Sequence, residues 1–177
     1  MHLAGYGLTI DDLKGFRQLG SLTPGHPEFG HTKGVETSTG PLGQGIANAV
    51  GMALAERMLA DRLGTPDEAF TPIDHRTIAF CGDGDLEEGI SHEACSLAGH
   101  LKLDRLLLIY DSNSITIEGS TSLACSDDVA MRFKAYGWRV LETDGHDFDA
   151  IDKALRKAFK LSGKPTILIA KTTIGKG

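Results

Sequence analysis

Several features are scarce in this 177-residue chain, and each absence excludes a class of protein. Only three cysteines occur, none at Cys-x-x-Cys spacing, which argues against a disulfide scaffold and for reduced thiols in the cytosol. No apolar run approaches the roughly 20 residues of a membrane span. The first residues, Met1 to Gly7, lack the charged and apolar regions of a signal peptide. The sequence therefore predicts a cytoplasmic protein with no membrane partner.

Basic residues are also fewer than acidic ones, with 18 Lys and Arg against 24 Asp and Glu. The formal net charge is −6, and Lys and Arg are scattered instead of forming a stripe, so no nucleic-acid partner is predicted. Hydrophobic residues make up 41% and charged residues 24%, near the average for soluble globular proteins. The length suits one α/β domain with a core of its own, and no internal repeat divides it. We expect a single domain over residues 1–177.

The familiar phosphate-binding and catalytic motifs are missing as well. Gly43-Gln44-Gly45 is followed three residues later by Asn48, so the dinucleotide fingerprint is incomplete. Lys176 is followed by Gly177 instead of Ser or Thr, which excludes a P-loop there. Neither a Gly-x-Ser-x-Gly elbow nor a His-Glu-x-x-His pair occurs. The chemistry must be sought in other residues.

Short apolar runs alternate with segments that have helical periodicity. This alternation predicts an α/β fold of three layers, in which helices cover both faces of a mostly parallel sheet. Strands are expected at 77–80, 106–110, 138–143 and 166–170, with a further extended segment at 115–117. Helices are expected at 9–19 with Thr9 as N-cap, and at 41–63, 88–101, 127–136 and 147–161.

Two of these segments have further features. Residues 20–40 form an expected loop rich in Gly, Pro, His and Thr, and a loop that long is usually functional or mobile. The helix that follows, expected to begin at Pro41, contains many small residues that favour close packing on a neighbour. Its apolar stripe is Leu42, Ile46, Ala49, Val50, Ala53 and Leu54, and the helix at 147–161 has Phe148, Ile151, Leu155 and Phe159 on one face.

One constellation predicts a metal site. Gly82-Asp83-Gly84 follows an apolar strand, and Asn113, 30 positions after Asp83, follows the next. Parallel strands bring both residues to the same sheet edge, where a carboxylate and an amide oxygen could share Mg²⁺. A backbone carbonyl, with Ile115 the preferred candidate, would be a third protein ligand, and diphosphate oxygens and water would complete the shell. The alternative is that Asp83 only caps a helix.

With these motifs the chain resembles the transketolase family, in the module that grips the diphosphate of thiamine diphosphate. The resemblance covers nearly the whole chain and is most specific in Thr23-Pro24-Gly25-His26-Pro27-Glu28 and Gly40-Pro41-Leu42-Gly43-Gln44-Gly45. It implies a thiamine-diphosphate-binding fold. It also implies Mg²⁺-dependent transfer of a two-carbon ketol unit from a ketose phosphate to an aldose phosphate, in the pentose phosphate pathway.

The resemblance also implies a role for particular residues. Asp83, Asn113 and the Ile115 carbonyl would bind Mg²⁺, with Ca²⁺ or Mn²⁺ as alternatives. Gly84 would lie against the diphosphate. The remaining cofactor-binding residues would line the pocket for the thiazolium and aminopyrimidine rings, and they are Gly40, Pro41 and Leu42.

Two residues would take part in catalysis. His26 would hydrogen-bond hydroxyls of the sugar-phosphate substrate. Glu88 would lie at a dimer interface, near a partner glutamate that activates the cofactor. We therefore expect a homodimer or a complementary subunit. The family's flanking segments and further domains are not in the sequence, so we interpret it as about a quarter of a transketolase-like polypeptide, incomplete at both ends. Alone it should be inactive and prone to self-association.

The sequence also leaves alternative functions open. Dihydroxyacetone synthase is a ketol transferase of the same class, and its discriminating residues need not lie in this segment. The Thr-Pro-Gly-His-Pro-Glu segment disfavours 1-deoxyxylulose-5-phosphate synthase. A cofactor-binding and dimerisation module without turnover is the alternative from a different class. The remaining histidines are interpreted as surface or structural residues: His31, His75, His92, His100 and His146.

Overall fold

The computed structural model describes residues 1–64 and 72–176. Four of the expected apolar runs form one sheet in the order β1-β2-β6-β5, and every neighbouring pair is parallel. The two central strands have almost fully buried side chains, which is why their sequences are continuously apolar. The strands are β1 (Thr77–Cys81), β2 (Leu106–Ser112), β5 (Arg139–Asp144) and β6 (Thr166–Lys171).

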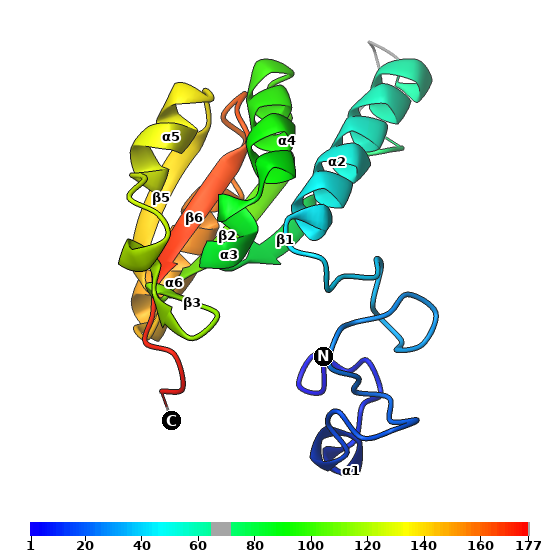
Figure 1. Cartoon of the computed structure of the whole chain (residues 1–177). Helices are drawn as coiled ribbons and strands as arrows, with labels where there is room; N and C mark the ends of the chain where they lie inside the picture. Colours follow the sequence, from blue (N-terminus) through cyan, green and yellow to red (C-terminus); the bar gives the residue numbers. More distant parts are fainter. Residues whose placement is uncertain (65–71, 177) are drawn as a thin grey trace.

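Helices cover both faces of this sheet, which confirms the three-layer prediction (Figure 1). On one face, α2 (Gln44–Leu63), α4 (Gly89–His100) and α5 (Val129–Ala135) enclose the larger core with side chains such as Leu108 and Ile167. On the other, α6 (Phe148–Ala158) packs on Leu107, Leu141 and Leu168. No helix among the described residues is long and apolar enough to cross a membrane.

The second face is covered unevenly. Side chains alternate along β1, and Ala79 packs against the larger core. The neighbours of Ala79 therefore point to the opposite face, where Ile78 is 46% exposed and Phe80 is 77% exposed. The edge strand β1 thus leaves an apolar strip without cover from the described residues.

Several helix boundaries differ from those expected, including the end of α6, which lies at Ala158 instead of Leu161. The first helix, α1, covers Ile10–Lys14 and begins as expected after Thr9, whose hydroxyl and backbone exchange hydrogen bonds with Asp12 in a capping box. It ends at Lys14, before the expected end near Leu19. Helix α2 begins at Gln44, so the expected start at Pro41 is wrong. The cause is Gly43, whose φ of 77° is left-handed and cannot continue a helix backwards.

The expected helix at 88–101 is in fact two helices. A short helix, α3 (Asp83–Glu87), precedes α4, and Glu88 separates them with an extended backbone at φ −72° and ψ 139°. Asp83 is therefore the first residue of a helix that follows β1 directly. This arrangement brings Asp83 and Asp85 next to the carboxyl end of the sheet.

A small hairpin follows β2. Its strands are β3 (Ile115–Thr116) and β4 (Gly119–Ser120), which pair antiparallel, with Ile115 opposite Ser120. A 3-10 turn, η1 (Thr121–Leu123), leads on toward α5. The extended segment expected at 115–117 is confirmed for its first two residues.

The apolar face expected on α6 is only partly correct. Phe148 is 87% exposed and Phe159 is 40% exposed, so neither lies in the core. The contact with the sheet is made by Leu155, as expected, together with Ala154 and Ala158. Small side chains let the helix lie close to the sheet, and the aromatic rings remain at its ends.

Residues 1–43, which we call the N-terminal arm, lead into α2 and contain α1 as their only helix (Figure 1). The expected loop at 20–40 is confirmed, since no helix or strand occurs there. The loop is held by local hydrogen bonds: the Thr23 hydroxyl donates to Asp12 O at 2.6 Å, and the Thr32 hydroxyl donates to Leu22 O at 2.6 Å. The arm is therefore ordered by polar contacts, without an apolar core.

Helices α4 and α5 meet at Gly99 and the end of α5. A Cβ on Gly99 would lie 1.9 Å from the carbonyl oxygen of Tyr136, so no side chain fits there. Nearby, the buried Trp138 indole donates to Cys95 O at 2.8 Å and meets the Phe133 ring edge-to-face at 5.0 Å. This crossing fixes α5 beside α4, and with it one wall of the site described below.

Candidate functional site

Asp83 and Asn113 meet at the carboxyl edge of the sheet. Strands β1 and β2 are parallel neighbours, with Cys81 opposite Tyr110, so the residues after them lie side by side. The Asn113 N–H points to Asp83 Oδ2 at 3.3 Å, and the Tyr110 hydroxyl donates to Asp83 Oδ1 at 2.7 Å. The Ile115 N–H in turn donates to Asn113 Oδ1 at 2.9 Å. The three residues expected to bind a metal are therefore brought together.

Tyr110 orients the Asp83 carboxylate through its hydrogen bond. Burial, and then the hydrogen bond to Asp83, raise the pKa of the Tyr110 phenol well above its usual range. The phenol therefore remains a proton donor at any physiological pH and holds the carboxylate in one orientation. Each carboxylate oxygen accepts one hydrogen bond here and keeps lone pairs for a second partner.

The chemistry of this donor set fits Mg²⁺. Asp83 supplies one carboxylate and Asn113 one amide oxygen, and the Ile115 carbonyl belongs to the hairpin that begins next to them. Within residues 1–64 and 72–176, no three His, Cys, Asp or Glu side chains gather closely enough to hold a metal by themselves. A cation at Asp83 would thus need oxygens from a ligand, as Mg²⁺ bound to substrate phosphates does.

A cavity of about 420 Å³ opens beside Asp83, between α3 and α5. Its charged lining is mostly acidic, with Asp83, Glu87, Asp127, Asp128 and Glu142 against Arg132 and Lys171. An anionic ligand near Asp83 would be repelled unless a cation accompanied it. The electrostatics of this edge therefore favour a metal–anion pair over an anion alone.

A second cavity, of about 290 Å³, brings together the residues expected to contact the cofactor rings and the substrate. It is lined by His26 of the arm and by Gly40, Pro41 and Leu42, together with Asp85. Gly40 has a φ of 149°, and a Cβ there would lie 3.0 Å from the His26 ring. His26 therefore lies directly against Gly40, although 14 positions separate them in the sequence.

Gly84 joins the two parts of the site. A Cβ on Gly84 would lie 3.3 Å from Leu42 Cδ1 and 3.3 Å from Thr116 Oγ1, so α3, the arm and the β3–β4 hairpin converge on this residue. Glu88 lies apart from the metal pair, exposed at the N-cap of α4. A Cβ on Gly43 would lie 2.9 Å from Glu88 Cβ, so Glu88 flanks the start of α2.

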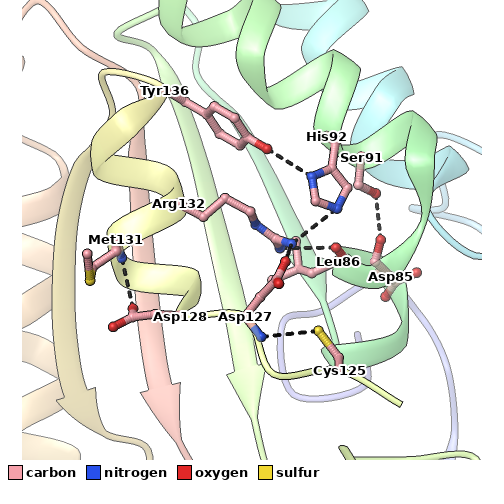
Figure 2. Close-up of polar contacts among 10 residues, drawn as sticks. All are labelled: Asp85, Leu86, Ser91, His92, Cys125, Asp127, Asp128, Met131, Arg132 and Tyr136. Carbon is pink, nitrogen blue, oxygen red and sulfur yellow. Dashed lines mark hydrogen bonds and ion pairs between the residues drawn. The ribbon is translucent and has the colours of Figure 1, made fainter.

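Sequence reasoning missed the residues that hold α3 in place (Figure 2). A helix of five residues leaves most of its carbonyls without intrahelical partners. Two of these carbonyls are satisfied from outside: the Ser91 hydroxyl donates to Asp85 O at 2.5 Å, and Arg132 Nη2 donates to Leu86 O at 3.0 Å. The helix that carries Asp83 is therefore anchored from both α4 and α5.

Arg132 is fixed by contacts of its own. Its Nη1 lies 3.0 Å from Asp127 Oδ2 and 3.2 Å from His92 Nε2, and the other His92 nitrogen lies 2.9 Å from the Tyr136 hydroxyl (Figure 2). No sequence motif predicts this network, because its residues are spread over α4, α5 and the turn before α5. Tyr110 gives a weak signal, since it stands at the end of a strand three positions before Asn113.

The fold and this edge define the class: a parallel α/β domain whose polar residues Asp83 and Asn113 meet at the carboxyl ends of neighbouring strands. The profile of the family described as "Transketolase, thiamine diphosphate binding domain" matches residues 1–177. The chain belongs to this family.

Individual curated relatives are also transketolases. The transketolase of Geobacillus stearothermophilus is 57% identical over 178 residues, covering 100% of this chain and 26% of the relative. Transketolase 1 of Escherichia coli K12 is 56% identical with the same coverage. The chain thus spans about a quarter of the length of these curated relatives.

Solved structures match equally well. The Campylobacter jejuni transketolase superposes with a TM-score of 0.89 at 58% identity, over 99% of this chain and 27% of that chain. A Pichia stipitis transketolase in complex with sedoheptulose 7-phosphate superposes with a TM-score of 0.92 at 51% identity, over 99% of this chain and 26% of that one. Another structure from Pichia stipitis, of transketolase mutants, is a complex with xylulose 5-phosphate. The α/β fold and the family membership are therefore established.

Proposed function

We propose that this chain forms the Mg²⁺–diphosphate half of a transketolase active site. In the complete protein it would support transfer of a two-carbon ketol unit from a ketose phosphate to an aldose phosphate, a reaction of the pentose phosphate pathway. The observation that carries this proposal is the meeting of Asp83 and Asn113 at one sheet edge, where the Asn113 N–H lies 3.3 Å from Asp83 Oδ2. Family membership supports the cofactor, and the sugar-phosphate complexes of relatives support the substrates.

The metal would be held by Asp83, Asn113 and the Ile115 carbonyl, with Mg²⁺ as the expected ion and Ca²⁺ or Mn²⁺ as substitutes. Tyr110 keeps the Asp83 carboxylate oriented, which reduces the reorganisation that metal binding would require. Binding of metal and diphosphate would be mutually dependent, because the metal neutralises the acidic lining that would repel the diphosphate, and the diphosphate supplies oxygen ligands that the metal needs.

Thiamine diphosphate, when bound, supplies the reactive carbon that carries the two-carbon unit between sugars. The chain's own residues bind and orient the reactants. Gly84, which has no side chain, lets the backbone approach the diphosphate, and Gly40, Pro41 and Leu42 form a wall of the smaller cavity. His26 in the same cavity would hydrogen-bond a hydroxyl of the sugar and hold it for reaction.

A partner chain belongs to the same proposal. Glu88 is exposed and flanks the start of α2, a position that suits contact with another subunit. We infer a homodimer, or assembly with a complementary subunit, in the cytoplasm. The glutamate that activates the cofactor would come from that partner, with Glu88 close to it.

The test uses the complete protein that contains this segment, freed of cofactor and metal. Addition of Mg²⁺ and thiamine diphosphate should restore formation of sedoheptulose 7-phosphate from xylulose 5-phosphate and ribose 5-phosphate. The isolated 177-residue chain, tested in parallel, should form none. Failure of the complete protein to bind thiamine diphosphate in the presence of Mg²⁺ would overturn the proposal.

A further inference from the structure

We propose that Asp85 is a positioning residue that sets the distance between the two halves of the cofactor site, an inference that rests on the function proposed above. One half is the Gly82-Asp83-Gly84 turn, which would hold the metal and the diphosphate. The other is the Gly40-to-Gly43 segment, which would contact the cofactor rings. Asp85 is the side chain that bonds directly to both.

The two carboxylate oxygens of Asp85 have separate partners. Oδ2 accepts from the Gly82 N–H at 2.9 Å, which caps α3, and Oδ1 accepts from the Gly43 N–H at 3.1 Å. Gly82 and Gly43 lie 39 positions apart in the sequence and belong to different segments of the fold. One carboxylate therefore links the end of β1 to the start of α2.

The Gly43 contact comes at a tightly constrained point. Gly43 has a left-handed backbone with φ 77°, and a Cβ there would lie 2.8–2.9 Å from atoms of Ile90, Glu88 and Ser91. The segment is thus pressed against the start of α4, with its N–H directed at Asp85. A shift of this N–H would move Leu42 relative to Gly84, whose ideal Cβ lies 3.3 Å from Leu42 Cδ1.

A carboxylate is the group that this geometry needs. Two N–H donors converge on one side chain, so it must present two acceptor oxygens. An amide has one acceptor oxygen, and its NH₂ group would face an N–H donor. Hydrogen bonds to a charged acceptor are also the stronger kind. Asp85 itself is held in place, because its backbone carbonyl accepts from Ser91 at 2.5 Å (Figure 2).

The experiment measures two dissociation constants on the complete apo-protein by calorimetry, both with saturating Mg²⁺. The first probe is thiamine diphosphate, which spans both halves of the site. The second is inorganic diphosphate, which reaches only the half with Asp83. If Asp85 sets the spacing, Asp85→Asn should weaken thiamine diphosphate binding about tenfold, the equivalent of one hydrogen bond to a charged group, and leave inorganic diphosphate within about twofold.

Two further variants separate positioning from helix capping. Asp85→Glu keeps a charge and a side chain suited to capping from this position, so α3 should fold, but its longer stem displaces the oxygens from Gly43. It should also bind thiamine diphosphate more weakly. Asp12→Asn is the matched control, because Asp12 caps α1 from the same helical position without bridging to a second segment. It should change neither dissociation constant.

Each outcome decides between support and rejection. A selective loss of thiamine diphosphate affinity in both Asp85 variants, with an unchanged thermal midpoint of the apo-protein, supports the proposal. Unchanged affinity, or an equal loss for both probes, overturns it and leaves Asp85 as a capping residue only. If the wild-type protein binds neither probe, the proposed function itself fails, and the role of Asp85 fails with it.

Discussion

The two halves of the proposed site are held in place by different means. In the sheet body, both Asp83 oxygens accept hydrogen bonds, from Tyr110 and Asn113, and Arg132 anchors the short helix that carries Asp83. In the N-terminal arm, His26 lies against Gly40, and its ring makes no hydrogen bond within the described part of the chain. The Asp83 side chain is therefore oriented by a polar network, whereas the His26 ring is positioned by van der Waals contact with Gly40.

Burial shows the same contrast. The buried apolar residues begin at Ile46, and none of them belongs to the arm. Apolar side chains of the arm are exposed instead, with Leu3 at 98% and Phe29 at 71%. Substitutions in the body should act on folding and on binding of the metal and diphosphate, and substitution of His26 in the arm should act on turnover.

The largest effect is expected at the α4–α5 crossing. Gly99→Ala would place a Cβ 1.9 Å from the Tyr136 carbonyl oxygen, a clash with backbone that no rotamer relieves. We expect a loss of about 3 kcal/mol or more in unfolding free energy. Thermal unfolding of the complete protein, followed by circular dichroism, measures it.

The control for this variant is Gly51→Ala. Gly51 is exposed in α2, and its ideal Cβ meets no described atom within 4 Å. Alanine there should stabilise the helix by about 0.5–1 kcal/mol. Equal midpoints for the two variants would show that α4 and α5 do not cross as described.

Loss of the metal ligand should have the next largest effect. Asp83→Ala removes the only carboxylate of the donor set, so binding of Mg²⁺ and thiamine diphosphate should weaken about 100-fold or more. Asn113→Ala should act in the same direction with a smaller loss, because an amide contributes no charge. Titration calorimetry on the complete protein measures both, with Asp152→Ala, an exposed carboxylate of α6, as the control. Unchanged cofactor affinity in Asp83→Ala would refute the metal assignment.

The sequence predicts the sheet and the meeting of Asp83 with Asn113 at its carboxyl edge, for a physical reason. Parallel strands buried on both faces must be apolar along their whole length, so β2 and β6 stand out. The polar residues that end such strands must then share one edge, which is why Asp83 and Asn113 could be paired in advance. Helix starts were less reliable. Pro41 is a favoured first helical residue, but the left-handed Gly43 overrode that preference.

The residues that support the site could not be predicted in this way. The sequence assigns Asp85 no role, because the short helix α3 that carries it was not expected and is held by tertiary contacts from Ser91 and Arg132. Arg132 meets Leu86 across 46 positions, a pairing that periodicity does not encode. Motifs reveal groups that meet a ligand, whereas the contacts behind them appear only once the chain has folded.

A substitution of His26 in the arm should have the opposite effects to one of Asp83: turnover should change, and cofactor affinity should not. His26→Ala in the complete protein should lower kcat/KM for ketose donors by the equivalent of about 1–3 kcal/mol, typical of one hydrogen bond to a substrate hydroxyl. Its cofactor affinity should stay nearly the same, because His26 lies outside the Asp83–Asn113 pair. His31→Ala is the control, since His31 bonds to Ser21 O within the same arm at 2.8 Å. If His26→Ala kept wild-type kinetics, His26 would be a structural residue.

The smallest effect is expected at the end of the sheet opposite the site. Glu56 of α2 is 3% exposed, and burial raises the pKa of its carboxyl above the ordinary value of 4.5, although Arg105 opposes the shift. The Arg105 guanidinium lies 3.3 Å from Glu56 Oε1, but that oxygen makes no hydrogen bond to any described residue. Ionisation of the Glu56 carboxyl therefore lowers the free energy of unfolding.

The raised pKa of Glu56 makes the stability of the folded protein depend on pH. The folded protein binds the Glu56 proton more tightly than the unfolded chain, so the stability from this group is fully present below pH 4.5 and is lost as pH rises through the raised pKa. Glu56→Gln removes the ionisation, so the variant should unfold a few degrees higher than wild type at pH 7, with the difference vanishing toward pH 4. Asp61→Asn, an exposed carboxylate of the same helix, is the control. Because Glu56 lies far from Asp83, thiamine diphosphate affinity should not change. A fall in that affinity would mean that the stability of the body and the site are not separable.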